Sequence, residues 1–192
     1  MKPFYQGKVD TFCALYAVLN ALRLTHSIRT LQGRSLFSAE LLRIAKNPVL
    51  FRQVLDQTTD YIDVIDSMIQ TSSQIHPLIC VIPFAPNTDV SVDQLWDTLD
   101  LWINSRTNST ALLRFMRYIN PPCDPCVRHW TTVGSITNTT IHLFDSSHEA
   151  DAILHLDKDR IKTNEKQITS ADLLYVQPSS IRLLRLKGAL PR

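Results

Sequence analysis

The chain has 192 residues, of which 44% are hydrophobic, and its 20 basic and 18 acidic side chains leave a formal net charge of +2. This length and apolar content predict a single domain with a sizeable core. The nearly balanced charge argues against a nucleic-acid-binding protein, and no apolar run reaches the roughly 18 residues that a membrane-spanning helix needs.

The amino end, MKPFYQGKVD, lacks the apolar segment of a secretory signal peptide. In a chain without such a signal, four cysteines favour free thiols over a disulfide framework. We therefore expect a soluble protein of the cytoplasm, or an effector that is secreted without a classical signal peptide. The sequence carries no signal for an oligomeric state.

The first strong element is a buried helix that begins close to Cys13. Apolar residues run almost without a break from Phe12 to Leu22, which is typical of a helix buried on nearly all its faces. Asp10 and Thr11 are the candidate N-caps. Cys13 then falls in the first turn, where unpaired amide hydrogens and the helix dipole favour a thiolate. It is a candidate nucleophile, although cysteines in apolar helices commonly only fill space.

Further helices are predicted after a polar connection over residues 23–37. Ser38 is expected to cap the next helix, Pro48 fits the first turn of another, and Thr58 or Thr59 begins a third. This series gives the amino-terminal half a helical character.

Residues 77–84 form a short apolar run that predicts a buried strand, in which Pro83 favours an edge or terminal position. Ser91 is the expected cap of a helix over residues 91–104. Trp96 and Trp102 on that helix are read as core aromatics, because helical spacing already explains them.

The second half of the chain is predicted to be mainly β-structure. Alternation and β-branched residues predict strands, a connection and one short helix, in this order: strand 111–118, strand 128–136, hairpin connection 137–140, strand 141–145, helix 170–176 and strand 181–186. We therefore expect an α+β domain over residues 1–192, with a helical subdomain at about 1–105 and an antiparallel sheet at about 106–192.

The hairpin places two polar residues together. His129 stands at the start of one strand and Asp145 sixteen residues later, at the end of the next. In a hairpin that turns near residues 137–140 they lie almost side by side at the open end. Asp145 then accepts a hydrogen bond from one ring nitrogen while the other faces a thiolate. A register slip of one residue would turn one of them to the wrong face. Taken separately, His129 also fits a surface or core histidine, and Asp145 a turn former before Ser146-Ser147.

A glutamine completes the set, because the Gln6 side-chain amide and the Cys13 backbone amide can both donate to an oxyanion. The order Gln, Cys, His, Asp, with the cysteine heading a buried helix, resembles the papain-like cysteine peptidases. The closest likeness is to the bacterial peptidases that process the leader peptides of exported bacteriocins. These share a His-aromatic strand and an Asp-small-small turn about sixteen residues later, here His129-Trp130 and Asp145-Ser146-Ser147.

The resemblance implies a papain-like fold, with Cys13 as nucleophile, His129 as general base and acid, Asp145 as its orienting group and Gln6 as an oxyanion donor. The implied activity is that of a thiol hydrolase, a cysteine peptidase or isopeptidase that cleaves a peptide or amide bond of a protein or peptide substrate without a metal or other cofactor. Gln6 precedes Cys13 by seven residues, where the family usually has six. The helices over residues 38–73 match no motif of the family.

Three alternatives remain open. The same triad serves amidases and transglutaminase-like acyl-transfer enzymes, and the fold can persist as a binding module without catalysis. A third reading starts from Cys123-Asp-Pro-Cys126, which with His129 offers three of four zinc ligands or a redox pair. The sequence shows no second ligand pair, and the surrounding prolines also fit a stiff loop. Zinc at this motif would occupy His129 and exclude the catalytic reading.

Overall fold

The computed structural model describes residues 1–6, 11–121, 125–147 and 152–191. These residues form a mixed α/β fold with five helices and a largely antiparallel sheet. The helices are α1 (Cys13–His26), α2 (Thr30–Ala45), α3 (Pro48–Leu55), α4 (Ile62–Ser73) and α5 (Val92–Ser105).

The sheet has the strand order β1-β8-β2-β3-β4-β5, and β7 pairs with both β2 and β6. The strands are β1 (Leu78–Val81), β2 (Ser109–Arg117), β3 (Val127–Ile136), β4 (Thr140–Leu143), β5 (His155–Asp157), β6 (Ile161–Lys162), β7 (Leu174–Val176) and β8 (Arg182–Leu186). All these pairs are antiparallel except β6 with β7.

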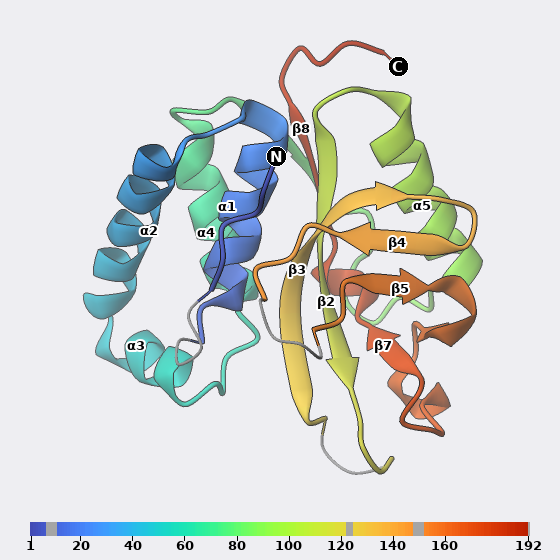
Figure 1. Ribbon diagram of the computed structural model, residues 1–192. Coiled ribbons are helices and arrows are strands. Elements are labelled where there is room, and N and C mark those ends of the chain that lie inside the picture. The colour runs from blue at the N-terminus through green and yellow to red at the C-terminus, as the bar shows by residue number, and fades with distance from the viewer. Residues whose placement is uncertain (7–10, 122–124, 148–151, 192) are drawn as a thin grey trace.

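Helices cover both sides of the central strands (Figure 1). Helices α1–α4 pack on one side around a core that includes Leu112 of β2 and Trp130 of β3. Helix α5 packs on the other side around a second core that includes Leu113 and Phe115 of β2. Strand β2 therefore has both faces covered, and eight of its nine residues are buried. This burial explains why its sequence reads as an apolar run rather than as strict alternation.

Two predicted helix boundaries are wrong. The chain is not a connection over residues 23–37, because α1 continues to His26 and α2 already begins at Thr30. Ser38 lies inside α2 and caps nothing. A polar composition concealed this helix, which packs on α1 through a few side chains such as Phe37. Gly33 lets α2 lie close to the amino-terminal segment, since a Cβ there would stand 2.9 Å from Cζ of Phe4.

Other expectations are only partly met in the structure. Helix α4 begins at Ile62, after Tyr61 in a left-handed conformation, rather than at Thr58 or Thr59. Strand β1 lies at the edge of the sheet, as Pro83 predicts, but it is largely exposed. Because β1 pairs with β8, the subdomain at about 1–105, which was expected to be separate from the sheet, contributes a strand to it.

The carboxyl-terminal third is also more β-rich than predicted. Residues 174–176 form strand β7 instead of the end of a short helix, and β5 and β6 occupy a stretch for which we expected no element. These strands have two or three residues each, too short for alternation to be recognised in the sequence.

Helix α5 follows its prediction closely. Ser91 accepts a hydrogen bond from the Gln94 amide at 3.1 Å, and the Gln94 side chain accepts from the Ser91 amide at 2.9 Å. Trp96 is buried, and the half-buried Trp102 donates from Nε1 to the carbonyl of Leu184 at 3.1 Å. No helix among the described residues has the length and apolar character needed to cross a bilayer.

Candidate active site

Cys13 is the first residue of α1 and is 9% exposed. The residue before it, Phe12, is the N-cap and contributes no side-chain cap. Thr11, one of the two predicted caps, directs its hydroxyl to the carbonyl of Val54 instead, and Asp10 lies outside the described residues. The start of α1 therefore carries the sulfur with no side chain of the described residues capping its amides.

Helix α1 is fixed by polar contacts as well as by its apolar faces. Thr132 of β3 donates its hydroxyl hydrogen to the carbonyl of Ala17 at 2.7 Å. Asn20 is fully buried, accepts from the backbone amide of Phe4 at 2.6 Å and donates to the Phe4 carbonyl at 3.2 Å. Asn20 thus ties the amino-terminal segment, which carries Gln6, to the helix that carries Cys13.

His129 and Asp145 meet as the hairpin register predicts. Nε2 of His129 lies 2.8 Å from Oδ2 of Asp145. Strand β4 ends at Leu143, and its pairing with β3 shifts by one residue between Val133 and Ser135. Beyond β4 the chain turns so that Asp145 is 4% exposed and accepts a hydrogen bond from the Ser147 amide at 2.7 Å.

The imidazole also interacts with the Cys13 side chain. Burial disfavours a charged ring, but hydrogen bonds to Asp145 and to the Cys13 side chain outweigh it and raise the pKa of His129 to about 10. Burial likewise opposes ionisation of Asp145, but the hydrogen bond and positive charge of His129 lower the pKa of that carboxyl. Because Asp145 takes Nε2, Nδ1 is the ring nitrogen left for the sulfur. The structure therefore joins Cys13, His129 and Asp145 in one chain of contacts.

Neighbouring residues of β3 point to opposite faces, as strand geometry requires. His129 faces Phe115, with ring centroids 5.4 Å apart, on the side of the second core. Trp130 lies in the core beneath α1, where its Nε1 donates to the carbonyl of Asp60 at 2.9 Å.

Gln6 lies beside the turn that carries Asp145. Its backbone amide donates to the carbonyl of Ser146 at 2.9 Å, and its Oε1 accepts from the Ser146 hydroxyl at 3.5 Å. The latter contact uses the amide oxygen of Gln6 and not Nε2, the nitrogen that an oxyanion would need. Residues 7–10, which connect Gln6 to the helix, lie outside the described residues.

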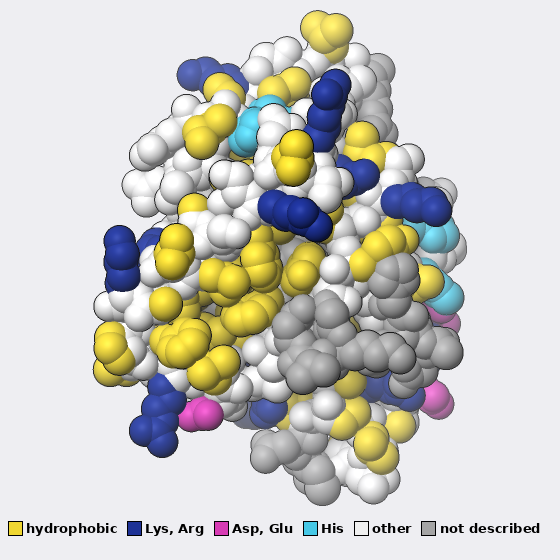
Figure 2. Space-filling model, turned by 60° about the vertical axis from the view of Figure 1, so that its left-hand side comes forward, with side chains coloured by type: hydrophobic (Ala, Val, Ile, Leu, Met, Phe, Trp, Pro, Cys, Tyr) yellow, Lys and Arg dark blue, Asp and Glu magenta, His cyan; other side chains and the backbone are white. Residues whose placement is uncertain are grey.

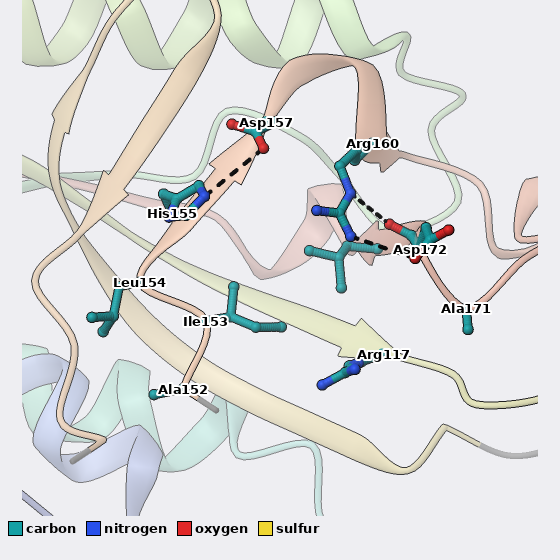
Figure 3. A pocket seen from close by; sticks show the side chains of 10 residues that line it. Arg117, Ala152, Ile153, Leu154, His155, Asp157, Arg160, Ala171 and Asp172 are labelled. Atoms are coloured by element: carbon teal, nitrogen blue, oxygen red, sulfur yellow. Dashed lines mark hydrogen bonds and ion pairs between the residues drawn. The ribbon is translucent and has the colours of Figure 1, made fainter. Parts of the chain in front are cut away.

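Two pockets adjoin the Cys13–His129 contact. One, of about 80 Å³, lies on the side of α1 and is bordered by Cys13. The other, of about 150 Å³, is bordered by His129 and Asp145. The second pocket shares Arg117 and Ile153 with a larger one of about 230 Å³, shown in Figure 3. Cys13 is thus buried, yet it borders a small hollow.

Arg114 and Tyr61 also shape the pocket beside Cys13, although the sequence analysis did not single them out. Tyr61 holds a left-handed backbone at φ 64° and donates its hydroxyl hydrogen to the carbonyls of Thr11 and Val54. The sequence carries a signal for Arg114, a charge in the middle of the apolar run ALLRFMRY. A similar signal marks Asn20, the one amide inside an otherwise apolar stretch.

The proposed zinc motif is only partly within the described residues. Cys123 lies outside them, and the thiol of Cys126 donates to the carbonyl of Arg117 at 3.3 Å. His129, the third residue of the motif, is engaged by Asp145 and Cys13. Among the described residues, no three His, Cys, Asp or Glu side chains are grouped as a metal site would need.

No protein-family model and no curated protein sequence matches this chain. The likeness to papain-like peptidases therefore stays a prediction. It rests on the order of four residues in the sequence and on the contacts among Cys13, His129 and Asp145.

Proposed function

We propose that this protein is a thiol hydrolase that cleaves a peptide or isopeptide bond in a protein or peptide substrate. The observation that carries the proposal is the chain of contacts from Asp145 through His129 to Cys13. Such a chain holds an imidazole in one tautomer beside a sulfur, which is what a cysteine nucleophile requires.

The reaction follows from these positions. The Cys13 thiolate attacks the carbonyl carbon, a C–S bond forms, and the carbonyl oxygen becomes an oxyanion. When the oxyanion collapses, the C–N bond breaks and the amine leaves with a proton from His129. Neutral His129 then takes a proton from water, whose oxygen attacks the thioester. The C–S bond breaks, which releases the carboxylic acid and restores the thiolate and imidazolium.

The oxyanion needs donors at the start of α1. The Cys13 backbone amide belongs to the first turn, where amides have no partner within the helix. We assign the second donor to Gln6, because its backbone is fixed beside the turn that carries Asp145. A donor of this kind typically accelerates catalysis by about 10²- to 10³-fold.

Alkylation of Cys13 by iodoacetamide tests the proposal, with the modified residue identified by mass spectrometry. At pH 7 we expect Cys13 to react faster than Cys80, an exposed cysteine on the edge strand β1. The His129→Ala variant should lose at least about tenfold of this rate, because the thiolate loses its counter-ion. The control is His142→Ala, which removes an exposed histidine of β4.

Turnover is then measured on a panel of fluorogenic peptides and isopeptides. Hydrolysis that disappears in both Cys13→Ala and His129→Ala supports the proposal. Equal alkylation of Cys13 in the wild type and in His129→Ala, together with no turnover of any substrate, would overturn it.

A further inference from the structure

Among the described residues, the pocket beside Cys13 is lined by two arginines and by no acidic residue. Its other borders are neutral polar or apolar side chains and a tyrosine hydroxyl that is already used in hydrogen bonds. The lining residues other than Cys13 and the arginines are Thr11, Gln57, Thr59, Tyr61, Pro125, Cys126 and Trp130. The concave space that adjoins the sulfur is therefore positively charged.

Arg114 is the inner of the two arginines and is 8% exposed. Its Nη1 donates to the side-chain oxygen of Gln177 at 3.3 Å, a neutral partner. Among the described residues no carboxylate forms an ion pair with it. The carboxylate of Asp60 attracts the Arg114 guanidinium electrostatically without forming an ion pair with it. Oδ1 of Asp60 accepts a hydrogen bond from the Ile62 amide at 3.1 Å. A buried guanidinium without an adjacent anion is unfavourable by several kcal/mol in general.

Arg128 brings a second positive charge to the same place. In the pairing of β2 with β3, Arg114 stands opposite Trp130 and Met116 opposite Arg128. Arg114 and Arg128 are therefore diagonal neighbours on one face of the two strands. Burial is the main cause of the lowered pKa of Arg114; the charge of Asp60 opposes it, and repulsion from Arg128 lowers the pKa further. Two like charges at such a position oppose each other unless an anion lies between them.

Some other arginines in the described part of the chain are paired with a carboxylate. Arg160 donates from Nε to the Asp172 carbonyl at 2.9 Å in the pocket of Figure 3, and its guanidinium lies 3.9 Å from the Asp172 carboxylate. The buried Arg182 binds both carboxylate oxygens of Asp66 at 2.6 and 3.0 Å. The fold thus pairs some arginines with a carboxylate, whereas no described carboxylate forms an ion pair with Arg114 or Arg128, and both border the small hollow next to Cys13.

We propose that Arg114 and Arg128 bind a carboxylate of the substrate in the pocket beside Cys13, so that the enzyme selects an acidic group next to the bond it cleaves. The role in substrate choice depends on the proposed hydrolase function. A pocket of about 80 Å³ admits a small group, and the fork of a guanidinium matches the geometry of a carboxylate. The carboxylate comes from an Asp or Glu side chain or from a free carboxyl terminus.

Two alkylating reagents that differ only in charge test the pocket itself. Iodoacetate carries a carboxylate where iodoacetamide carries a neutral amide of similar size. We measure the ratio of their alkylation rates at Cys13 and divide it by the same ratio for N-acetylcysteine in the same solution. The normalised ratio of the rate with iodoacetate to the rate with iodoacetamide should be roughly 10, as expected for a charge-assisted hydrogen bond.

Arg128→Gln should lower this ratio several-fold, and Arg128→Glu should bring it below one. Arg128 is exposed, so its replacement leaves the core intact. The matched control is Arg52→Gln, which removes an exposed arginine of α3 that does not border the pocket. Arg114→Gln is compared only if its circular dichroism and unfolding midpoint match those of the wild type.

The outcomes separate the two proposals. A ratio near one, or a ratio that Arg128→Gln leaves unchanged, overturns the carboxylate pocket even if alkylation depends on His129. Equal slowing of both reagents in Arg128→Gln also overturns it, because the arginine then acts on the thiolate alone. A high ratio with alkylation independent of His129 supports the pocket and counts against the hydrolase.

Protection experiments identify the source of the carboxylate. Cys13 is alkylated with iodoacetamide in the presence of N-acetylglutamate α-amide, N-acetylalanine, N-acetylglutamine α-amide or inorganic phosphate. Protection by the first supports an acidic side chain, and protection by the second supports a free carboxyl terminus. No protection by either, or stronger protection by phosphate or by the neutral amide, overturns the assignment.

Discussion

Helices α1 and α5 have the same length, 14 residues, and pack on opposite sides of the same sheet, but they begin differently. Helix α5 starts with a reciprocal cap between Ser91 and Gln94 and has Asp93 in its first turn. Among the described residues, no side chain caps α1, and its first turn holds no acidic residue. Its first turn holds Cys13 instead.

The two helices also differ in burial. Ten residues of α1 are buried, against four of α5. Packing therefore stabilises α1 strongly enough that a poor N-terminus is tolerated, whereas α5, buried on one face only, gains from its cap. Under the proposed function, the first turn of α1 serves the charge that arises during catalysis. Substitutions at α1, at the residues beside it and at α5 test this difference.

The largest effect is expected at the first residue of α1. Cys13→Ala should lower kcat by at least about 10⁴-fold, because the nucleophile is lost. The matched substitution is Val92→Ala at the first residue of α5, which should leave kcat within about twofold. Turnover of a peptide identified in the substrate panel measures both. Retained activity in Cys13→Ala would show that Cys13 is not the nucleophile.

A smaller loss is expected from the amide assigned to the uncapped end. Gln6→Ala should lower kcat by about 10²-fold and leave residual turnover, because the Cys13 backbone donor remains. KM should change little, since the interaction forms mainly in the transition state. Gln53→Ala, at an exposed position of α3, serves as the control. An unchanged kcat in Gln6→Ala would remove Gln6 from the oxyanion site.

The His129–Asp145 pair should make stability depend on pH. The pKa of His129 rises from 6.5 to about 10 on folding, so its contribution is complete below pH 6.5 and is lost as pH rises through about 10. Asp145, whose pKa falls below 3.8, contributes above that pH and loses its contribution in stronger acid. The free energies of unfolding of the wild type and of His129→Gln, measured in urea, should therefore differ most between about pH 4 and pH 6.5.

The difference in free energy of unfolding between the two proteins should decrease steadily as the pH rises from 6.5 to about 10. Asp157→Asn, which alters a partly exposed carboxylate of β5, should show no comparable alkaline change. A stability difference between wild type and His129→Gln that stays constant from pH 5 to pH 10.5 would contradict the charged pair.

The smallest effect is expected at the cap of α5. Ser91→Ala should destabilise the protein by about 1 kcal/mol, because the Gln94 amide loses its acceptor. The rate of Cys13 alkylation should stay the same, since α5 lies on the other side of the sheet. Urea unfolding and the alkylation assay measure the two quantities. A slower alkylation would show that the two helices are coupled through the sheet.

Local signals explain which parts of this structure were predictable from sequence. Ser91, Pro48 and the hairpin around residues 137–140 act through neighbouring residues, and each lies at or beside the predicted boundary. Helix α2 and the short strand β7 depend on distant partners, and sequence reasoning missed or misread them. The same distinction holds in the candidate site.

Within the site, the meeting of His129 with Asp145 follows from one hairpin, so its register was enough to predict it. The pocket of Arg114 and Arg128 forms only when the loop before α4 folds against β2 and β3. That arrangement joins segments more than 50 residues apart, for which a single sequence gives no pairing rule. Figure 2 shows hydrophobic side chains gathered on the face of the helical side. No periodic pattern in the sequence predicted this surface.

The irregularity in β3 has a consequence for changes in chain length. The pairing with β4 shifts around Gly134, whereas the pairing with β2 runs evenly from Thr132 to Val127. Deleting Gly134 would remove the extra residue and leave Val133 opposite Leu143 and Ser135 opposite His142, so neither ladder would have to slip. Deleting Thr131 would instead shift His129 by one position relative to the rest of β3 and turn its ring to the face that Trp130 now occupies. The number of residues between His129 and the bulge therefore fixes the site, and a deletion there is more damaging than most substitutions.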